Sequence, residues 1–499
     1  MSSRPNILLV MADQLSAPFL RPYGGDTVVS PSIDRLAAEG IVFERAYSNS
    51  PLCAPARFSM MSGRLNSAIG AYDNASEFAA SIPTFAHYLR FGGYQTSLVG
   101  KMHFVGPDQL HGFEERLTTD IYPADFGWTP NWDDPDGRFD WWFHNMDSVT
   151  GAGVADVSNQ LDYDDEVGFR AVRKLRDLAR TGDDRPWHLT VSFTHPHDPY
   201  VARQEFWDLY EGVEIPLPST SAIADAELDP HSARLRHVIA ADVTEVTAAQ
   251  IRSARRAYFA NVSYVDRWLD ELLATLERHG MADDTVVIFT SDHGDMLGER
   301  GLWYKMSFYE HSTRIPFVVR LPGRRSPGRA TTPITLMDVA PTLLDLAGVP
   351  IPEQFDGSSV MGFVDRPEPG RTVVGEFLGE GAIAPIFMIR SGRWKYVWSE
   401  PDPPQLYDLD DDPSELVNLA GTPEHGATAA GFEREIHDRW DVARVDAEVR
   451  ADQRARRDVD RAMRQGRFRS WDFQPVTDAS EQYMRNHLDL NDVERSRRA

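Results

Sequence analysis

The chain has 499 residues, and its 51 lysines and arginines against 76 aspartates and glutamates give a formal net charge of −25. This acidity disfavours nucleic-acid binding, because most of that affinity comes from cationic side chains that neutralise phosphates. The single cysteine excludes an intrachain disulfide and a thiolate metal cluster.

The first apolar stretch of the chain covers residues 7–12. It is too short for the apolar core of a signal peptide and far below the ~20 residues that a membrane span needs. We interpret it as a buried strand and expect a globular, cytoplasmic protein with no membrane partner.

The cysteine comes next, in the run Cys53-Ala54-Pro55-Ala56-Arg57. Proline suits the first turn of a helix, so a helix is predicted over about 55–64. Position 53 then faces a helix N-terminus, which favours negative charge, and Arg57 lies one turn further on. These residues alone are compatible with a buried structural cysteine or with a thiolate nucleophile.

Three further buried strands are predicted over residues 96–99, 189–194 and 286–290, with amphipathic helices over 165–180 and 248–279. This alternation predicts an α/β layered fold, in which ligands bind beyond the carboxyl ends of the strands. Polar side chains follow all four predicted strands at that end, namely Asp13, Gln14, Lys101, His103, His195, His197, Asp292 and His293.

Eight aromatic residues fall between positions 122 and 143. Aspartates, glycine and proline accompany them, so a long loop is predicted rather than a strand. Such a loop either folds on its own aromatic side chains or forms a cage that attracts a quaternary ammonium group.

The pattern of predicted strands and helices changes twice in the C-terminal part of the chain. We predict a main domain over 1–365, a smaller α+β subdomain over 366–430 and a helical extension over 431–499. In the extension, Phe432, Ile436, Trp440, Val445 and Val449 form an apolar stripe. This stripe packs either on its own domain or against another copy of the chain.

Cys-x-Pro-x-Arg, followed here by Ser-x-x-x-Gly-Arg, resembles the modification motif of type I sulfatases. The segments Pro5–Gln14, Gly100–His103 and Thr290–Asp295 are similar to that family in the same order, so the resemblance covers essentially the whole chain. It implies an alkaline-phosphatase-like core with a mixed central sheet, a smaller C-terminal subdomain and a helical tail. It also implies that a formylglycine-generating enzyme oxidises Cys53 to formylglycine, whose hydrate is the nucleophile.

The resemblance further implies one divalent cation held by Asp13, Gln14, Asp292 and His293. The carboxylates favour Ca²⁺, but the imidazole of His293 means that the site could also bind Mn²⁺. The implied catalytic groups are Arg57, Lys101 and Lys305 on the sulfuryl oxygens, His197 as the acid for the leaving alkoxide and His103 as the base. A part for His195 is left open against simple packing at the strand end.

Segments 379–381, 387–396 and 471–480 with 483–486 are similar to the choline-sulfatase branch of this family. That similarity implies hydrolysis of choline O-sulfate to choline and sulfate by a homo-oligomer, a dimer or tetramer in which the tail reaches a neighbouring subunit. The trimethylammonium site would then be formed by Trp128, His144, Asn145, Glu380 and Asp489.

Two other functions stay open. Gln14 and His293 also occur in related phosphonate monoester and phosphodiester hydrolases, so the metal site does not decide between sulfur and phosphorus. From another class, a non-catalytic choline- or betaine-binding protein would keep Cys53 unmodified.

Overall fold

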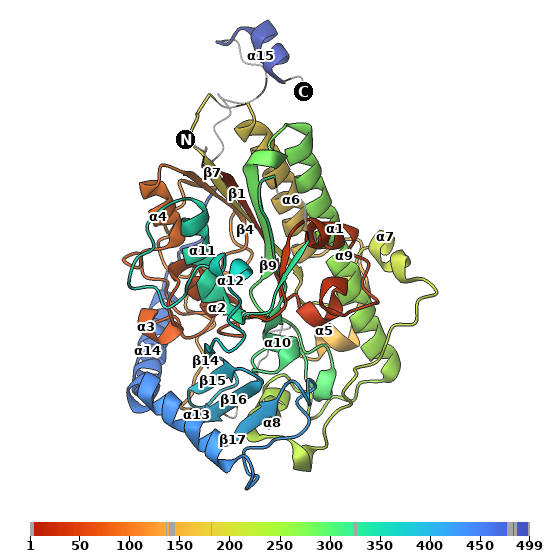
Figure 1. Ribbon diagram of the computed structural model, residues 1–499, viewed down its shortest axis with the longest axis vertical. Coiled ribbons are helices and arrows are strands. Elements are labelled where there is room, and N and C mark those ends of the chain that lie inside the picture. Colours follow the sequence, from red (N-terminus) through yellow and green to blue (C-terminus); the bar gives the residue numbers. More distant parts are fainter. Residues whose placement is uncertain are drawn as a thin grey trace.

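The computed structural model describes residues 4–135, 137–138, 145–180, 182–323, 327–476, 483 and 487–497. An eight-stranded mixed sheet runs through its centre in the order β12-β2-β11-β9-β1-β7-β4-β5 (Figure 1). The four strands predicted from the sequence are its parallel middle, and the α/β fold is confirmed: they are β9 (Thr285–Ser291), β1 (Asn6–Asp13), β7 (Trp187–Pro196) and β4 (Gln95–Gly100).

Both faces of β1 are covered, which explains its unbroken apolar sequence. Successive side chains of a strand point to opposite faces, and Leu8 and Val10 lie in one core whereas Ile7 and Leu9 lie in a second. The first core is closed by helices α1 (Pro31–Glu39), α6 (Asn159–Leu178) and α9 (Ala248–Arg278). The second is closed by α2 (Cys53–Ser62), α4 (Phe85–Phe91) and α11 (Val339–Leu346).

The predicted helices are confirmed with corrected ends. α6 begins before residue 165 because the side chain of Ser158 caps it, accepting a hydrogen bond from the backbone N–H of Leu161. α2 begins at Cys53 rather than at Pro55, and it ends at Ser62 because Gly63, with φ +65°, adopts the left-handed conformation. Cys53 is therefore the first residue of a helix.

A second sheet of four antiparallel strands lies C-terminal to the main one. It consists of β14 (Val373–Phe377), β15 (Ile386–Ser391), β16 (Trp394–Ser399) and β17 (Asp402–Asp408). Helix α13 (Gly426–Arg439) packs on it, and α14 (Val442–Met463) follows.

The apolar stripe of the extension packs within its own chain. Ile436, Trp440, Val445 and Val449 are buried members of the first core, and the ring of Trp440 stacks on Phe387 with centroids 4.6 Å apart. These four residues are therefore not available for contact with another copy of the chain. The division of the chain at 365 and 430 stays a prediction.

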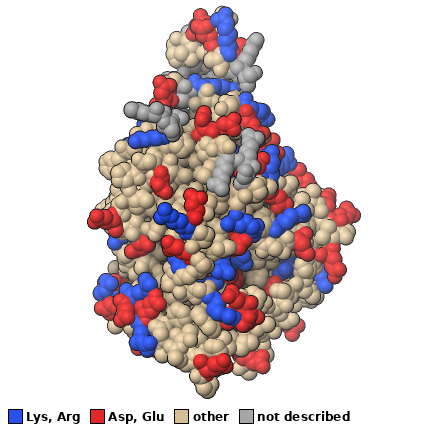
Figure 2. Space-filling view, viewed as in Figure 1, with Lys and Arg blue, Asp and Glu red and all other residues tan. Residues whose placement is uncertain are grey.

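The remaining helices and strands are short and connect these layers. No helix among the described residues is long and apolar enough to cross a membrane. Figure 2 shows acidic and basic side chains interspersed on the visible face, without a single acidic patch there. The short elements are β2 (Ile41–Phe43), β3 (Ala46–Tyr47), α3 (Asn66–Ile69), β5 (Glu115–Arg116), α5 (Asp147–Thr150), β6 (Gly153–Val154), β8 (Val201–Ala202), α7 (Gln204–Trp207), α8 (Pro230–Val238), α10 (Glu310–Thr313), β10 (Arg314–Ile315), β11 (Phe317–Arg320), β12 (Gly328–Ala330), β13 (Ile334–Thr335), α12 (Gly362–Asp365) and α15 (Leu490–Arg497).

The contact between α6 and α9 gives a test of the packing. A methyl group on Gly168 of α6 would lie 2.2 Å from the indole of Trp268 on α9. We expect Gly168→Ala to lower the free energy of unfolding by about 1–3 kcal/mol, because overpacking outweighs the ~1 kcal/mol that alanine gains in a helix. Gly431→Ala in α13 is the control, since its methyl group would meet only an Arg434 nitrogen at 4.0 Å. Urea unfolding compares the two, and equal losses would contradict this account.

Candidate active site

The strand order brings four residues that are distant in sequence to one point. β1 lies between β9 and β7, so its last residue, Asp13, ends beside the turn that follows β9. That turn supplies Asp292 and His293, and the start of α2 supplies Cys53. One ligand atom from each of these four buried residues lies within 4.8 Å of the others.

Arg57 holds the two carboxylates together. Its Nη2 donates to Asp13 Oδ2 (3.0 Å) and its Nε to Asp292 Oδ2 (2.9 Å). Its Nη1 donates to the carbonyl oxygen of Lys101 (2.6 Å) and to Ser192 Oγ (2.8 Å). All three nitrogens are engaged by protein atoms, so the direct effect of Arg57 is to fix the spacing of Asp13 and Asp292. Its predicted contact with sulfuryl oxygens stays a prediction.

Lys101 adds a second positive charge at Asp13. Its ammonium forms an ion pair with Asp13 Oδ2 and lies 4.1 Å from the centre of the Tyr122 ring. Burial opposes ionisation of Asp13, but Lys101 and Arg57 outweigh it and hold the pKa of this carboxyl well below its usual value. Asp13 is therefore a carboxylate at neutral pH.

His293 presents a lone pair to the cluster. Its Nδ1 lies 3.0 Å from the carbonyl oxygen of Gly294, which can only accept, so Nδ1 bears the proton. Nε2 then lies 3.8 Å from Asp13 Oδ1 and 3.8 Å from Asp292 Oδ2 as an acceptor, and burial lowers the pKa of the ring. Two carboxylates and a neutral imidazole oriented by a carbonyl form a donor set that fits a divalent cation.

Cys53 points into this cluster. Its Sγ lies 3.2 Å from His293 Nε2 and 3.9 Å from Asp13 Oδ1. Burial and then the charge of Asp13 raise the pKa of Cys53 to about 11, so the thiol is protonated at neutral pH. Burial thus outweighs the nearby cations Lys101 and Lys305, so this site does not activate the thiol as an electropositive, partly exposed site would.

A buried network links Gln14, Lys305 and His197. Lys305 Nζ donates to Gln14 Oε1 (2.6 Å) and lies 2.7 Å from His197 Nε2. The Nε2 of Gln14 donates to Asp295 Oδ2 (2.7 Å) and Asp198 Oδ1 (3.2 Å). The amide oxygen of Gln14 therefore faces Lys305, and its predicted role as a metal ligand stays a prediction.

His103 differs from the other site histidines. Neither ring nitrogen has a hydrogen-bond partner among the residues that the structure describes, and the ring centroid lies 5.0 Å from that of Tyr122. Burial and then Lys101 lower its pKa to about 3, so the imidazole is neutral. A neutral imidazole with unpaired nitrogens can accept a proton from a reacting hydroxyl.

Glu380 is a second buried group without a partner. Both its carboxylate oxygens lack a hydrogen-bond partner within the described part of the chain. Burial, followed by the charge of Asp73, raises its pKa to about 8, and interactions with Cys53 and Lys305 also contribute. Glu380 is therefore within electrostatic reach of the cluster.

The other predicted substrate-binding residues have different outcomes. Trp128 lies beside His103, with ring centroids 5.9 Å apart, and the carbonyl oxygen of Asn145 accepts from the Tyr304 hydroxyl (2.6 Å). His144 lies outside the described residues, as do the aromatic residues Phe139, Trp141, Trp142 and Phe143 and part of the tail motif, residues 477–480 and 484–486.

Two predicted candidates make structural contacts of their own. Asp489 accepts from the backbone N–H of Asn491 (2.9 Å) just before α15, which lies near the N-terminus at the opposite end of the central strands (Figure 1). His195 has its Nδ1 2.6 Å from Asp164 Oδ2 on α6, and its ring meets Tyr264 of α9. These contacts favour the packing interpretation of His195.

Three residues of the site were missed by sequence reasoning. Asp295 accepts from both Gln14 and Tyr200, and burial raises the pKa of Asp198 to about 8. Asp295 lies two residues after the predicted metal ligand His293, and Asp198 directly follows the predicted acid His197, so both belong to segments that the sequence analysis had already identified. Tyr122, over Lys101, belongs to the aromatic loop, and only the fold reveals its partner.

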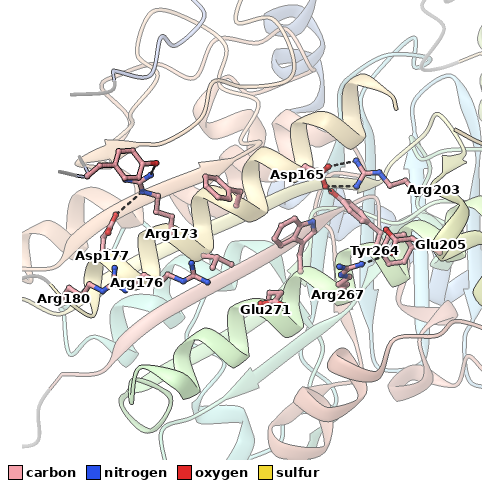
Figure 3. Close-up of a pocket in the computed structure, with 15 residues that line it drawn as sticks. Asp165, Arg173, Arg176, Asp177, Arg180, Arg203, Glu205, Tyr264, Arg267 and Glu271 are labelled. Carbon is pink, nitrogen blue, oxygen red and sulfur yellow. Dashed lines mark hydrogen bonds and ion pairs between the residues drawn. The ribbon is translucent and has the colours of Figure 1, made fainter. Parts of the chain in front are cut away.

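A separate cavity of about 640 Å³ lies between α6 and α9 (Figure 3). Arg173 and Arg176 of α6, Arg180 just beyond its end and Arg267 of α9 line it, together with Tyr483 from the tail. None of the predicted site residues lines this cavity, so it is distinct from the cluster at the strand ends.

Comparison with family models places the site in context. The sulfatase model matches residues 5–349, which include Asp13, Cys53 and Asp292. The chain belongs to the sulfatase family. The model of the C-terminal region of N-sulphoglucosamine sulphohydrolase matches residues 298–441, and that of the choline sulfatase C-terminus matches residues 447–498.

Individual sulfatases agree with this assignment. The chain is 51% identical over 506 residues to a choline-sulfatase of Rhizobium meliloti (strain 1021), covering 100% of this chain and 99% of that protein. An arylsulfatase of Clostridium perfringens (strain 13 / Type A) is 26% identical, with 85% of this chain and 91% of that protein covered. The solved phosphonate monoester hydrolase of Agrobacterium radiobacter has a TM-score of 0.69 at 25% identity, covering 90% and 96%.

The contrast between His103 and His195 gives a paired test in this sulfatase. We expect His103→Ala to lower kcat for a sulfate ester by about 10²–10⁴-fold with little change in Tm, because the ring makes no hydrogen bond to any other described residue. We expect His195→Ala to leave kcat within about twofold but to lower the Tm, since buried Asp164 loses the imidazole and keeps only the backbone N–H groups of Thr194 and His195. Initial rates and thermal unfolding measure both, and an inactive, stable His195→Ala protein would contradict the assignment.

Proposed function

We propose that this sulfatase hydrolyses choline O-sulfate to choline and sulfate. The observation that supports it most is a buried carboxyl group without a counter-charge near a cationic cluster. Lys101 and Lys305 lie at the Cys53 cluster, and Glu380, which has no hydrogen-bond partner in the described structure and a pKa raised to about 8, would ionise once a cation binds beside it. Choline sulfate has a sulfate at one end and a quaternary ammonium at the other. The similarity to a choline-sulfatase adds further support.

Cys53 is the proposed source of the nucleophile, after a formylglycine-generating enzyme has oxidised it. Hydrated formylglycine supplies two hydroxyls on one carbon: one bonds to sulfur as the bond from sulfur to the choline oxygen breaks, and loss of the proton from the other expels sulfate and restores the aldehyde. The high pKa of the unmodified thiol supports this assignment over a direct thiolate attack.

Asp13, Asp292 and His293 are proposed to hold one divalent cation, with Gln14 as a further ligand if its amide turns from Lys305. Such an ion supplies Lewis acidity to the nucleophile and to a sulfuryl oxygen. Carboxylates are the majority of the fixed donors, which supports Ca²⁺, with Mn²⁺ as the second choice. Elemental analysis of the purified protein, with Asp292→Asn as the metal-poor reference, tests this.

Proton transfer is assigned to residues on two sides of Cys53. His197 Nε2 lies 2.7 Å from the Lys305 ammonium, and Nδ1 of His197 lies 2.6 Å from the carbonyl oxygen of Asp198. Because Nδ1 donates to that carbonyl, Nε2 accepts from Lys305, and the pair can deliver a proton to the departing alkoxide through His197. His103, neutral and unpaired in the described structure, is the proposed base on the other side.

The trimethylammonium group is proposed to bind against Glu380 and Trp128, with His144 and Asn145 completing the pocket. A quaternary ammonium cannot donate a hydrogen bond, so it suits a carboxylate that has no donor and an aromatic face. We also propose a homo-oligomer, in which the tail and Asp489 approach a neighbouring copy. Helix α15, which begins directly after Asp489, lies near the N-terminus at the opposite end of the central strands, and this supports that arrangement (Figure 1).

A phosphonate monoester or phosphodiester hydrolase is the second candidate. It is favoured by Gln14 and His293 and by the fold shared with a phosphonate monoester hydrolase. That enzyme would have no need of a buried carboxylate without a partner, which is the feature that favours choline sulfate.

Substrate comparison on fully modified protein tests the proposal. We expect kcat/KM for choline sulfate to exceed that for a phenyl phosphonate monoester by at least about 100-fold, and mass spectrometry of the Cys53 peptide to show formylglycine. A larger kcat/KM for the phosphonate would support the second candidate. An active preparation with a full-mass thiol at Cys53 would exclude the formylglycine mechanism, and choline binding without turnover would indicate a binding protein.

Replacement of the carboxylate tests the cation pocket. We expect Glu380→Gln, which keeps the shape of the side chain, to lower kcat/KM for choline sulfate by roughly 30–150-fold, or about 2–3 kcal/mol, because the buried counter-charge is lost. Hydrolysis of 4-nitrophenyl sulfate, which lacks the ammonium group, is the internal control and should change by less than about twofold. Parallel losses on both esters would show that Glu380 acts elsewhere.

A further inference from the structure

One face of α14 contacts the two segments that flank the proposed cation pocket. The first is the aromatic loop around Trp132, and the second is the loop 379–383, which contains Glu380. Arg450 Nη1 donates to the carbonyl oxygen of Trp132 (3.1 Å), and its Nη2 donates to that of Ile383 (2.6 Å). One guanidinium therefore joins the backbones of both segments.

The next residues on this face extend the connection. The Gln453 side-chain oxygen accepts from the backbone N–H of Trp132 (3.0 Å), so both backbone polar groups of Trp132 are held by α14. The indole of Trp132 in turn donates to the carbonyl oxygen of Gly379 (3.0 Å), the residue before Glu380. A continuous chain of hydrogen bonds thus leads from α14 to the neighbour of the pocket carboxylate.

Arg456 secures a third segment on the same face. Its guanidinium donates twice to Asp73 (2.8 and 2.6 Å) and once to Thr129 Oγ1 (3.1 Å), the residue after Trp128. Gly379 packs directly against this region, since a methyl group on it would lie 2.6 Å from Leu52 and 3.6 Å from Asp73. The turn that bears Asp73 therefore backs the loop that bears Glu380.

The two flanking loops also border open space. A cavity of about 340 Å³ is lined by Trp132 from one loop, by Gly381, Ala382 and Ile383 from the other, and by Arg457 of α14. Side-chain packing does not fill the gap between the loops along its whole length. The separation of the loops is then fixed by the hydrogen bonds from α14 together with the direct bond from the Trp132 indole to Gly379.

We propose that Arg450 is a positioning residue for substrate recognition, which holds the aromatic loop and the Glu380 loop at the separation that fits a trimethylammonium group. This inference rests on the proposed choline-sulfate activity. Among the described residues, no hydrogen bond or ion pair joins Arg450 to the Cys53 cluster or to Glu380, so it acts through Trp132 and Ile383. It falls, with Gln453 and Arg456, inside the match to the choline sulfatase C-terminal region, residues 447–498.

Arg454 offers a matched control one turn further along α14. Arg450 and Arg454 both pair with Asp133, at 3.1 Å each, and conversion of either to methionine removes one positive charge from the same place. Only Arg450 reaches the backbone of the two loops. Comparing Arg450→Met with Arg454→Met therefore separates loop positioning from the loss of charge.

The test measures KM and kcat for choline sulfate and for 4-nitrophenyl sulfate at equal formylglycine content. We expect Arg450→Met to raise KM for choline sulfate at least tenfold with kcat within threefold, and to leave kcat/KM for 4-nitrophenyl sulfate within twofold. Arg450→Lys, whose single ammonium cannot span two carbonyl oxygens, should retain the raised KM. Arg454→Met should match the unsubstituted enzyme on both esters.

A second variant guards against a simple folding defect. Trp132→Phe keeps the ring but removes the indole donor to Gly379, and we expect the same selective rise in KM. Equal kinetics for Arg450→Met and Arg454→Met, or parallel losses on both esters in Arg450→Met and Trp132→Phe, would overturn the positioning role. If the unsubstituted enzyme cleaves 4-nitrophenyl sulfate but not choline sulfate, the proposed function itself fails and the inference falls with it.

Discussion

The reaction centre depends on one buried guanidinium. Asp13 and Asp292 stand at the ends of adjacent parallel strands, where two carboxylates without counter-charge would repel each other in a site that excludes water. Arg57 bridges them, and removal of one partner from such a buried network typically costs about 3–5 kcal/mol. The sheet can offer two oxygen ligands at one point because α2 starts one turn before this arginine.

The charges proposed to recognise the substrate are few and buried. The cationic groups at Cys53, and Glu380 once a bound cation ionises it, would act in a medium of low dielectric, where each interacts more strongly than an exposed side chain. The acidic and basic residues on the surface are interspersed and screened by solvent (Figure 2). The net charge of −25 therefore gives little information about the substrate. The buried carboxyl group of Glu380, unpaired in the described structure, is more informative, because it suits a substrate with a cationic end.

Much of this arrangement could be predicted from the sequence. The parallel strands are continuous apolar runs because both of their faces are covered, and their polar ends gather at one edge. The partners of Gln14 and Arg57 could not be predicted, since they lie between 44 and 291 positions away in the sequence and depend on rotamers. Arg450 and Gln453 belong to α14, whose sequence predicts that such polar side chains are exposed to solvent. Only the fold shows that they hold two loops.

The burial of Cys53 limits when, during synthesis and folding, the proposed modification can take place. Its side chain, at the start of α2, is 1% exposed, and Sγ lies 3.2 Å from His293 Nε2. The proposed modifying enzyme would have to reach Cys53 while the N-terminal segment is still extended, before β9, some 230 residues later in the chain, closes the cluster. Under that proposal the fraction of active molecules depends on the relative rates of folding and modification, so two samples of identical sequence and stability would differ in specific activity according to how fast they were synthesised.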